Sequence, residues 1–343
     1  MRARVAICIA CGAIAALISG PPAEAAFPGA NGKIAFTQSG GINVVNQDGS
    51  GRAQIFADPY ALKPTWSPDG TKIAFASKRD DPSPGTCSPC NYELYVIDAD
   101  GGNLHRVTND ADVDFSPSWS PDGSQLAFTR GDHVWTIGAD GADATAVTTF
   151  TTGGLLWDAT TSPAWSPDGA EIAFSGHYDD GHVRSGVFAI GPDGTGLRVL
   201  TPEGATGDSP DWAPDGSRLV LALDANDYPF SELVTIPRVA GDGATHRLGR
   251  PAAAPVWSPD GTRLLVDGQS GGFVTMNPDG SDPQTVPNSG FFRPDWQPIP
   301  APPDGKNRSK ACKAERERLG EAEYVAKYGG GASAHGRCVS RKG

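Results

Sequence analysis

Residues 64–75 have the sequence PTWSPDGTKIAF, and much of this stretch recurs along the chain. The tryptophans of the six copies are Trp66, Trp119, Trp165, Trp212, Trp257 and Trp296, with spacings of 53, 46, 47, 45 and 39 residues. Five copies continue into Pro-Asp-Gly, and the sixth stops at residues 296–298. A period of about 40–50 residues built from short strands is typical of a propeller or another repeat array.

The segment SPDG at residues 67–70 has the composition of a tight turn. Proline presets φ at the second turn position, aspartate tolerates the third, and glycine supplies the positive φ that follows. An alternating strand follows at residues 72–75, and a short strand with a proline two residues ahead of the tryptophan precedes it. Because proline has no donor for the strand ladder, this first strand is predicted to be the innermost one, at the channel.

A second turn, Asp-Gly, closes each unit. Its six copies begin at Asp48, Asp100, Asp140, Asp193, Asp242 and Asp279. Asp-Gly between apolar runs indicates a hairpin, so each unit has four strands and two tight turns. The last unit lacks its Asp-Gly, and residues 31–36 supply the missing half of that turn and the following strand. We therefore expect a six-bladed all-β propeller closed by pairing residues 33–36 with the Trp296 strand, which leaves no open blade edge.

The pattern Pro-x-Trp-Ser-Pro-Asp-Gly-x-x-Ile-Ala-Phe resembles the repeat of TolB-type six-bladed propellers, the WD40-like PD40 repeat. It also resembles the propellers attached to prolyl-oligopeptidase-like peptidases. The resemblance covers about residues 27–298. It implies a propeller that works through protein contacts, as TolB does. The α/β domain that precedes the TolB propeller, and the hydrolase domain of the peptidases, are not expected in this chain.

The N-terminal residues predict export. Arg2 and Arg4 precede an apolar run at residues 5–18, and AEA at residues 23–25 is a small-residue cleavage signal. This pattern is typical of a secretory signal peptide cut after Ala25. No other long apolar run follows, so we expect a protein without a transmembrane segment, secreted or located in the periplasm or cell envelope. The expected organisation is a signal peptide at 1–25, a propeller at 26–298, a Pro-rich linker at 299–308 and a small tail at 309–343.

Four cysteines remain after signal cleavage: Cys87, Cys90, Cys312 and Cys338. An even count in an exported chain indicates disulfides, with a local Cys87–Cys90 bridge and a Cys312–Cys338 bridge across short tail helices. A redox-active role for the first pair is the alternative. Residues 299–343 hold ten lysines and arginines against five acidic residues, whereas the whole chain has a net charge of −12. The tail is either a solvated end or a contact to the ring or to an anionic envelope polymer, and the acidic balance argues against nucleic acid.

The loops ahead of the inner strands are the candidate binding site, because loops on a rigid scaffold concentrate binding residues. We expect them to ring one mouth of the channel with Lys63, Asp112, Asp114, Asp158, Asp208, Arg250 and Arg293. Carboxylates fall on three successive blades and bases on the other three. This pattern predicts a polarised mouth for a dipolar partner such as a peptide end; ordinary solvated loops are the alternative.

Two motifs with catalytic residue types are interpreted as structural. GQSGG at residues 268–272 matches Gly-x-Ser-x-Gly but joins two strands, whereas a nucleophile elbow needs a strand and a helix. His177 and His182 share one variable loop with two aspartates, and no further ligand is evident. No catalytic residue, cofactor or metal is predicted, although calcium on oxygen ligands stays open.

Together these observations predict an exported, monomeric, non-catalytic binding or scaffold protein for a protein, peptide or cell-envelope component. The alternative is a small propeller hydrolase or lyase with its active site at the channel mouth. That alternative needs histidine or several carboxylates on the inner strands, because acid–base chemistry requires such groups within hydrogen-bond reach of the substrate.

Overall fold

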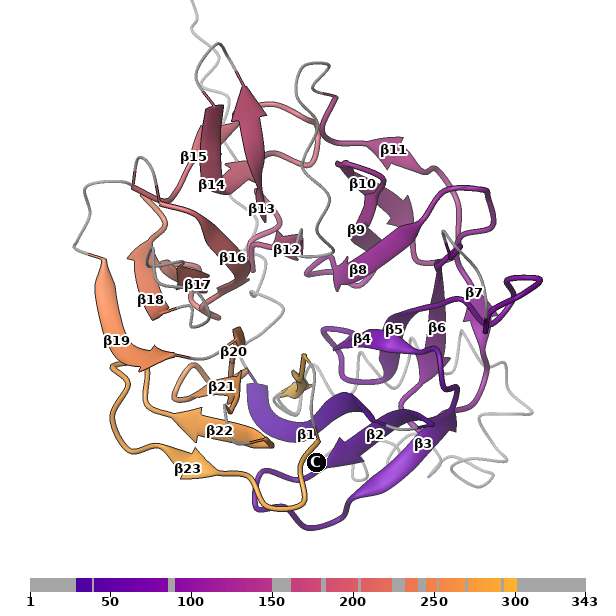
Figure 1. The fold of residues 1–343 in the computed structure, drawn as a ribbon, viewed down its shortest axis with the longest axis horizontal. Helices are drawn as coiled ribbons and strands as arrows, with labels where there is room; N and C mark the ends of the chain where they lie inside the picture. The colour runs from indigo at the N-terminus through magenta and orange to yellow at the C-terminus, as the bar shows by residue number, and fades with distance from the viewer. Residues whose placement is uncertain are drawn as a thin grey trace, which may run out of the picture.

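The computed structural model describes residues 29–38, 40–85, 90–149, 162–179, 183–202, 205–223, 232–239, 245–251, 253–268, 271–290 and 293–300. These residues form 24 strands in six four-stranded sheets, which are arranged around a common axis like the blades of a propeller (Figure 1). The predicted six-bladed all-β fold is confirmed. In these stretches of the chain, no helix has the length and hydropathy that a membrane crossing requires.

Each blade is an antiparallel sheet and is named here after its innermost strand. The β4 blade has β4 (Leu62–Trp66), β5 (Lys72–Ser77), β6 (Glu93–Asp98) and β7 (His105–Arg106). The β8 blade has β8 (Asp114–Trp119), β9 (Gln125–Arg130), β10 (His133–Gly138) and β11 (Thr145–Ala146). The β12 blade has β12 (Ala164–Trp165), β13 (Ile172–Asp179), β14 (Val183–Ile190) and β15 (Arg198–Val199).

The remaining three blades complete the ring. The β16 blade has β16 (Gly207–Trp212), β17 (Arg218–Leu223), β18 (Glu232–Pro237) and β19 (His246–Pro251). The β20 blade has β20 (Ala253–Trp257), β21 (Leu264–Asp267), β22 (Phe273–Met276) and β23 (Gln284–Thr285). The β24 blade has β24 (Asp295–Pro300), β1 (Gly29–Gln38), β2 (Gly41–Val45) and β3 (Ala53–Ala57).

The β24 blade joins the two ends of the ring. Its innermost strand comes from the C-terminal side, and its other three strands come from the N-terminal side (Figure 1). Ile34 pairs with Trp296 and Ala35 pairs with Asp295, so the predicted closure is confirmed. Because both ends contribute to one sheet, the ring has no unpaired blade edge at its seam.

The Ser-Pro-Asp-Gly turns follow from local chemistry. In the first one, the Ser67 hydroxyl donates to Asp69 Oδ1 at 2.7 Å and accepts the Lys72 N–H at 2.9 Å. Gly70 has φ of +66°, and a Cβ at this position would lie 2.2 Å from the carbonyl oxygen of Pro298 in the β24 blade. Glycine is therefore required both by the turn and by the close approach of the neighbouring blade.

The hydrophobic core is divided among the blade junctions. Each of six buried clusters joins residues of two neighbouring blades and contains one repeat tryptophan. Each of these tryptophans is at most 7% exposed. Because an aromatic side chain of this size dominates the packing of its surroundings, the repeat phrase places one such anchor at every junction.

A bulge at the repeat proline shapes the start of the inner strands. The pairing register shifts between Leu62 and Thr65 in β4, and equivalent shifts occur in β8, β16 and β20. The residue before the proline has a positive φ at Lys63, Ser116, Ser209, Ala254 and Arg293 (47–54°). Such a backbone is costly for a residue other than glycine and is typical of functional sites. In these four blades the bulge therefore aims the side chain before the proline differently from the one after it.

Candidate mouth of the propeller channel

One end of the channel opens into a cavity of about 130 Å³ built from all six inner strands. The residues before the six prolines form what we call the mouth ring: Lys63, Ser116, Ser162, Ser209, Ala254 and Arg293. The residues after the prolines form the floor ring: Thr65, Ser118, Ala164, Asp211, Val256 and Asp295. The floor ring also lines a second cavity of about 70 Å³, deeper in the channel among the six tryptophans.

Two cationic side chains meet in the mouth ring. Lys63 Nζ contacts the hydroxyl of Ser116 and lies 3.4 Å from the hydroxyl of Ser162. Arg293 Nη1 donates to the same Ser162 hydroxyl at 2.9 Å and to Ser209 at 3.2 Å. Arg293 precedes the β24 blade and Ser162 precedes the β12 blade on the opposite side of the ring, so the guanidinium reaches across the mouth. The Lys63 ammonium also lies over the Phe115 ring, 4.7 Å from its centroid.

The floor ring carries two carboxylates. Asp295 Oδ2 accepts the backbone N–H of Trp66 at 2.6 Å and the Thr65 hydroxyl at 3.0 Å. Asp211 Oδ2 accepts the backbone N–H of Trp257 at 2.7 Å. Each bond links an inner strand to the next blade. Desolvation inside the ring raises the pKa of Asp211 to about 7, with the Asp295 charge adding to the rise, and raises the pKa of Asp295 to about 6.

Neighbouring blades are joined by hydrogen bonds to the floor ring, and the acceptor alternates between a floor side chain and a floor backbone carbonyl group. At three of them the floor side chain accepts the next tryptophan's backbone N–H, as Ser118 does for Trp165 at 3.2 Å. At two of the others the floor carbonyl accepts an indole N–H, from Trp119 to Thr65 and from Trp212 to Ala164. Thus the polar floor side chains already serve the fold, whereas the mouth ring points its polar groups into the cavity.

Three of the predicted site residues with described side chains lie at or beside the mouth. Lys63 and Arg293 line the cavity. Asp208 lies next to it, where it accepts the Ser209 hydroxyl at 3.0 Å. Burial raises the pKa of Asp208, against the opposing effect of the Arg293 and Lys63 charges.

The other predicted residues do not line this cavity or are not described. Asp114 is fully buried, and Arg130 on β9 binds both of its carboxylate oxygens at 2.7 Å. Burial raises the pKa of Asp114 to about 6, although Arg130 acts in the opposite direction. Asp112 is exposed in the loop before β8. Asp158 and the side chain of Arg250 lie outside the described residues.

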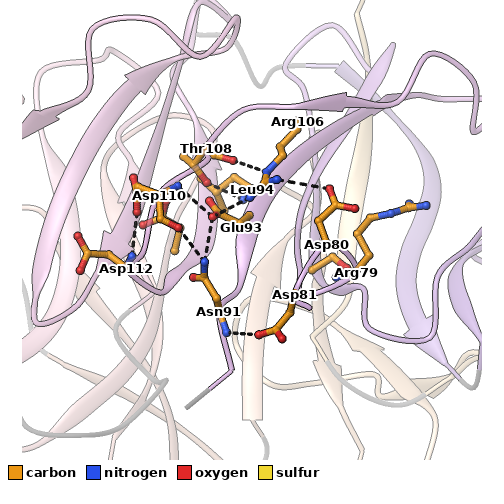
Figure 2. Close-up of polar contacts among 12 residues, drawn as sticks. Arg79, Asp80, Asp81, Asn91, Glu93, Leu94, Arg106, Thr108, Asp110 and Asp112 are labelled. Carbon is orange, nitrogen blue, oxygen red and sulfur yellow. Dashed lines mark hydrogen bonds and ion pairs between the residues drawn. The ribbon is translucent and has the colours of Figure 1, made fainter. Parts of the chain in front are cut away.

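A second polar cluster surrounds Glu93 at the start of β6 (Figure 2). Glu93 is 2% exposed, and its Oε1 accepts hydrogen bonds from Arg106 at 2.9 Å, Asn91 at 3.2 Å and the Asp110 N–H at 3.1 Å. Figure 2 shows these groups converging on Glu93 from both sides. The cluster lies at the same end of the strands as the mouth, because Ser77 on β5 pairs with Glu93.

Carboxylate oxygens of Glu93, Asp110 and Asp114 lie within 4.8 Å of one another. Arg130 contacts Asp110 at 2.6 Å as well as Asp114, and Arg106 neutralises Glu93. Two guanidinium groups thus offset most of the negative charge of the three carboxylates. Buried carboxylates are retained where such partners are present, so this arrangement is an ion-pair network that joins the β4 and β8 blades.

Several predictions fall on other segments. Gly268 and Gly272 bond to each other across the turn that joins β21 to β22, so the predicted repeat turn at GQSGG is confirmed. The side chains of His177 and His182, together with Cys87, Cys312 and Cys338, lie outside the described residues. The signal peptide, the tail beyond residue 300 and the Asp242 turn also lie outside them. The disulfides therefore stay predictions.

Sequence reasoning missed the three mouth serines and the two floor aspartates. Ser116, Ser162 and Ser209 occupy the position before the proline, where Lys63 and Arg293 were noticed because of their charge. Asp211 and Asp295 occupy the variable position of Pro-x-Trp. Aligning the six repeats and comparing the residues before and after the proline would have pointed to both rings.

The fold and its mouth define a class: a six-bladed propeller whose channel opens into a polar, partly cationic cavity. The PD40 family, described as the TolB beta propeller domain, matches residues 38–238. This is more than half of the chain, and the chain belongs to that family.

Curated relatives share short segments with the chain. The Tol-Pal system protein TolB of Alcanivorax borkumensis is 37% identical over 68 residues, which are 20% of this chain and 14% of that protein. TolB of Bordetella pertussis is 43% identical over 58 residues, 17% of this chain and 11% of that protein. The chain thus matches only a small part of the length of these relatives.

Solved structures with the same fold include proteins of different kinds. TolB from Acinetobacter baumannii has a TM-score of 0.63 and 19% identity, covering 79% of this chain and 67% of that chain. A chain of the nidogen/laminin complex has a TM-score of 0.60 and 13% identity, covering 78% and 99%. Hydrazine synthase of Kuenenia stuttgartiensis has a TM-score of 0.56 and 15% identity, covering 79% and 47%. At these identities the likeness shows the fold alone.

Proposed function

We propose that this chain is an exported, non-catalytic binding or scaffold protein that holds a protein, peptide or cell-envelope component at the channel mouth. The observation that carries the proposal is the mouth ring, where Lys63, Arg293 and three serines from five blades face one cavity. Strained positive φ values at five of its residues support a binding role, because such strain persists where function needs the geometry.

Membership of the TolB propeller family supports the same conclusion. The curated relatives are named as Tol-Pal system proteins, which favours a protein partner in the cell envelope. The expected signal peptide at residues 1–25 supports export of the chain to that compartment. We propose that the protein works as a monomer, since the closed ring satisfies its own strand edges.

One observation favours the alternative of a small hydrolase or lyase. Asp211 and Asp295 bring two carboxyl groups with raised pKa values to the floor of the mouth cavity, an arrangement that acid–base enzymes use. However, one oxygen of each is occupied by a backbone N–H of the next blade. The described residues that line the cavity include no histidine or cysteine. Binding therefore accounts for more of the site than catalysis does.

Affinity capture from an envelope extract tests the proposal. The bait proteins are the intact chain, an Arg293→Glu variant, and a matched Arg247→Glu variant on outer strand β19, where the arginine side chain is 62% exposed. We expect the intact chain and Arg247→Glu to capture the same partner and Arg293→Glu to lose it. Equal capture by all three would contradict binding at the mouth. A fourth bait, a chain that ends at Pro300, tests the tail. If this bait alone loses the partner, the tail makes the contact.

A further inference from the structure

The mouth ring presents two serine hydroxyl hydrogens that no acceptor among the described residues uses. A hydroxyl group has one hydrogen to donate and lone pairs to accept. The hydroxyls of Ser116 and Ser162 accept from Lys63 and Arg293, and their own hydrogens have no acceptor among the described residues. Two cationic head groups and two hydroxyl hydrogens therefore surround the centre of the mouth, which is the donor set that binds an oxyanion.

The surrounding charges select the kind of anion. Asp208 adjoins the mouth through Ser209, and Asp211 and Asp295 lie directly below it on the floor ring. These carboxylates offset much of the positive charge of Lys63 and Arg293. A singly charged carboxylate is favoured over a phosphate dianion, because the second negative charge would meet the floor at short range.

The shape of the cavity selects the end of a chain. Six prolines form its walls, and Ala254 and Val256 make one side apolar. The floor ring separates the mouth cavity of about 130 Å³ from the smaller cavity of about 70 Å³ beneath it. A cavity of this size holds one small residue that ends in a charged group. An internal segment of a polymer fits less well, because the chain on both sides of it would have to pass out through the same mouth above the floor ring.

From this geometry we infer that the mouth ring is a carboxylate cradle that takes the C-terminal residue of a peptide or protein partner. The free carboxylate lies against Lys63, Arg293 and the Ser162 hydroxyl, and the last side chain packs against the proline wall near Ala254. The inference rests on the proposed function and adds the chemical group that the mouth recognises. Arginine suits this role because its planar guanidinium matches a carboxylate.

Calorimetric titration of the full chain tests the cradle. The probes are a pool of N-acetylated tetrapeptides that end in alanine or valine with a free carboxylate, and the same pool as C-terminal amides. At low salt we expect the acid pool to bind at least about tenfold more tightly than the amide pool, which corresponds to one charge-assisted hydrogen-bond pair. Equal binding of the two pools, or no binding of the acid pool, would overturn the inference.

Two variants locate the effect. Arg293→Gln and Lys63→Met should each remove most of the preference for the acid pool, whereas Arg247→Gln on the outer strand should keep it. The melting temperature of each variant is measured to check that it is folded. An acid preference that survives both mouth substitutions would place the anion elsewhere and overturn the assignment. Tighter binding of digalacturonate or inorganic phosphate than of the acid pool would overturn the peptide assignment in favour of a glycan or a phosphate.

The result separates this inference from the proposed function. If Arg293→Glu abolishes partner capture while the acid and amide pools bind equally, the mouth binds a partner by other contacts and only the cradle is wrong. If Arg293→Glu still captures the partner and Arg293→Gln keeps the preference for the acid pool, both proposals fail.

Discussion

The mouth ring and the floor ring lie two residues apart on the same strands, yet they have opposite charges and different tasks. Arg293 and Asp295 are separated only by Pro294. Arg293 donates to serine hydroxyls across the open mouth, whereas Asp295 holds the backbone N–H of Trp66 in the next blade. The comparison teaches that the position relative to the proline decides whether a polar side chain is available to a ligand or used by the fold.

The proline causes this division. It has no N–H for the ladder, so a bulge at its position costs no hydrogen bond. The residue before it adopts a left-handed backbone and turns its side chain toward the mouth. The residue after it returns to regular pairing, as Trp66 and Thr65 do with Ile73 and Ala74. The repeat thus builds two stacked rings of different chemistry from one short phrase.

The first test asks whether the floor ring contributes more to the stability of the fold than the mouth ring does. At pH 5, where the Asp295 carboxyl with its pKa of about 6 is largely protonated, we expect Asp295→Leu to lower the free energy of unfolding by about 3 kcal/mol. The reason is that it strands the buried Trp66 N–H and the Thr65 hydroxyl without an acceptor. Arg293→Leu should change the free energy of unfolding by less than about 0.5 kcal/mol. Urea unfolding measures both.

Asp295→Asn is the matched control, because its amide oxygen still accepts from Trp66. It should recover most of the stability that Asp295→Leu loses. Equal losses for Asp295→Leu and Arg293→Leu would show that the two rings do not divide their tasks as described.

A second test uses the titration of Asp211. Its pKa is raised from 3.8 to about 7, so the folded state binds the proton more tightly than the unfolded state. The free energy of unfolding therefore falls as the pH rises from about 4 to about 7. Asp211→Asn keeps an acceptor for the Trp257 N–H and removes the charge. At pH 8 we expect it to be more stable than wild type by about 4 kcal/mol, because the pKa rises by about three units and each unit is worth about 1.4 kcal/mol.

At pH 4 the Asn variant and the wild type should be about equally stable, because the Asp211 carboxyl is then neutral in the folded state. Urea unfolding at both pH values checks this, with Asp112→Asn as the control that removes a carboxyl group from an exposed loop. A parallel pH profile for Asp211→Asn and wild type would mean that the floor carboxyl is not desolvated as the structure indicates.

The blade count and the closure of the ring were predictable because they depend on local turn chemistry. The Ser-Pro-Asp-Gly phrase specifies its own hairpin, and the incomplete copy at Trp296 indicates its complement at residues 31–36. The site was only partly predictable. Lys63 and Arg293 were identified by charge, but Asp114 pairs across the ladder with Arg130. That pairing depends on strand register, which the sequence pattern alone does not show.

The floor aspartates could not be predicted for a related reason. In a regular strand the residues two positions apart share a face, so Arg293 and Asp295 would be expected to point the same way. The positive φ of Arg293, at the position before the proline, breaks that rule. The strain is visible only in the folded backbone, because no glycine marks it in the sequence.

A third test concerns the mouth alone. Once a partner is captured, its association rate can be measured by surface plasmon resonance with wild type, Arg293→Glu and the outer-strand control Arg247→Glu. We expect Arg293→Glu to slow association about tenfold at low salt, because charges at the rim of an interface act mainly on the association rate. The difference should shrink at 1 M salt, where screening extends over only about 3 Å. Equal rates for both variants would remove the mouth ring from the interface.

The smallest expected effect compares two alanines that are almost equally buried, Ala254 in the mouth ring and Ala164 in the floor ring, at 9% and 8% exposure. Glycine in place of Ala164 should cost about 1 kcal/mol, because the unfolded chain gains freedom and the strand gains nothing. Glycine in place of Ala254 should be nearly neutral, because it also relieves the backbone of a residue with φ of +47°. Thermal unfolding of the two variants measures the difference. If Ala254→Gly loses as much stability as Ala164→Gly, the backbone before the proline is not strained, and the physical distinction between the two rings would then rest on their side chains alone.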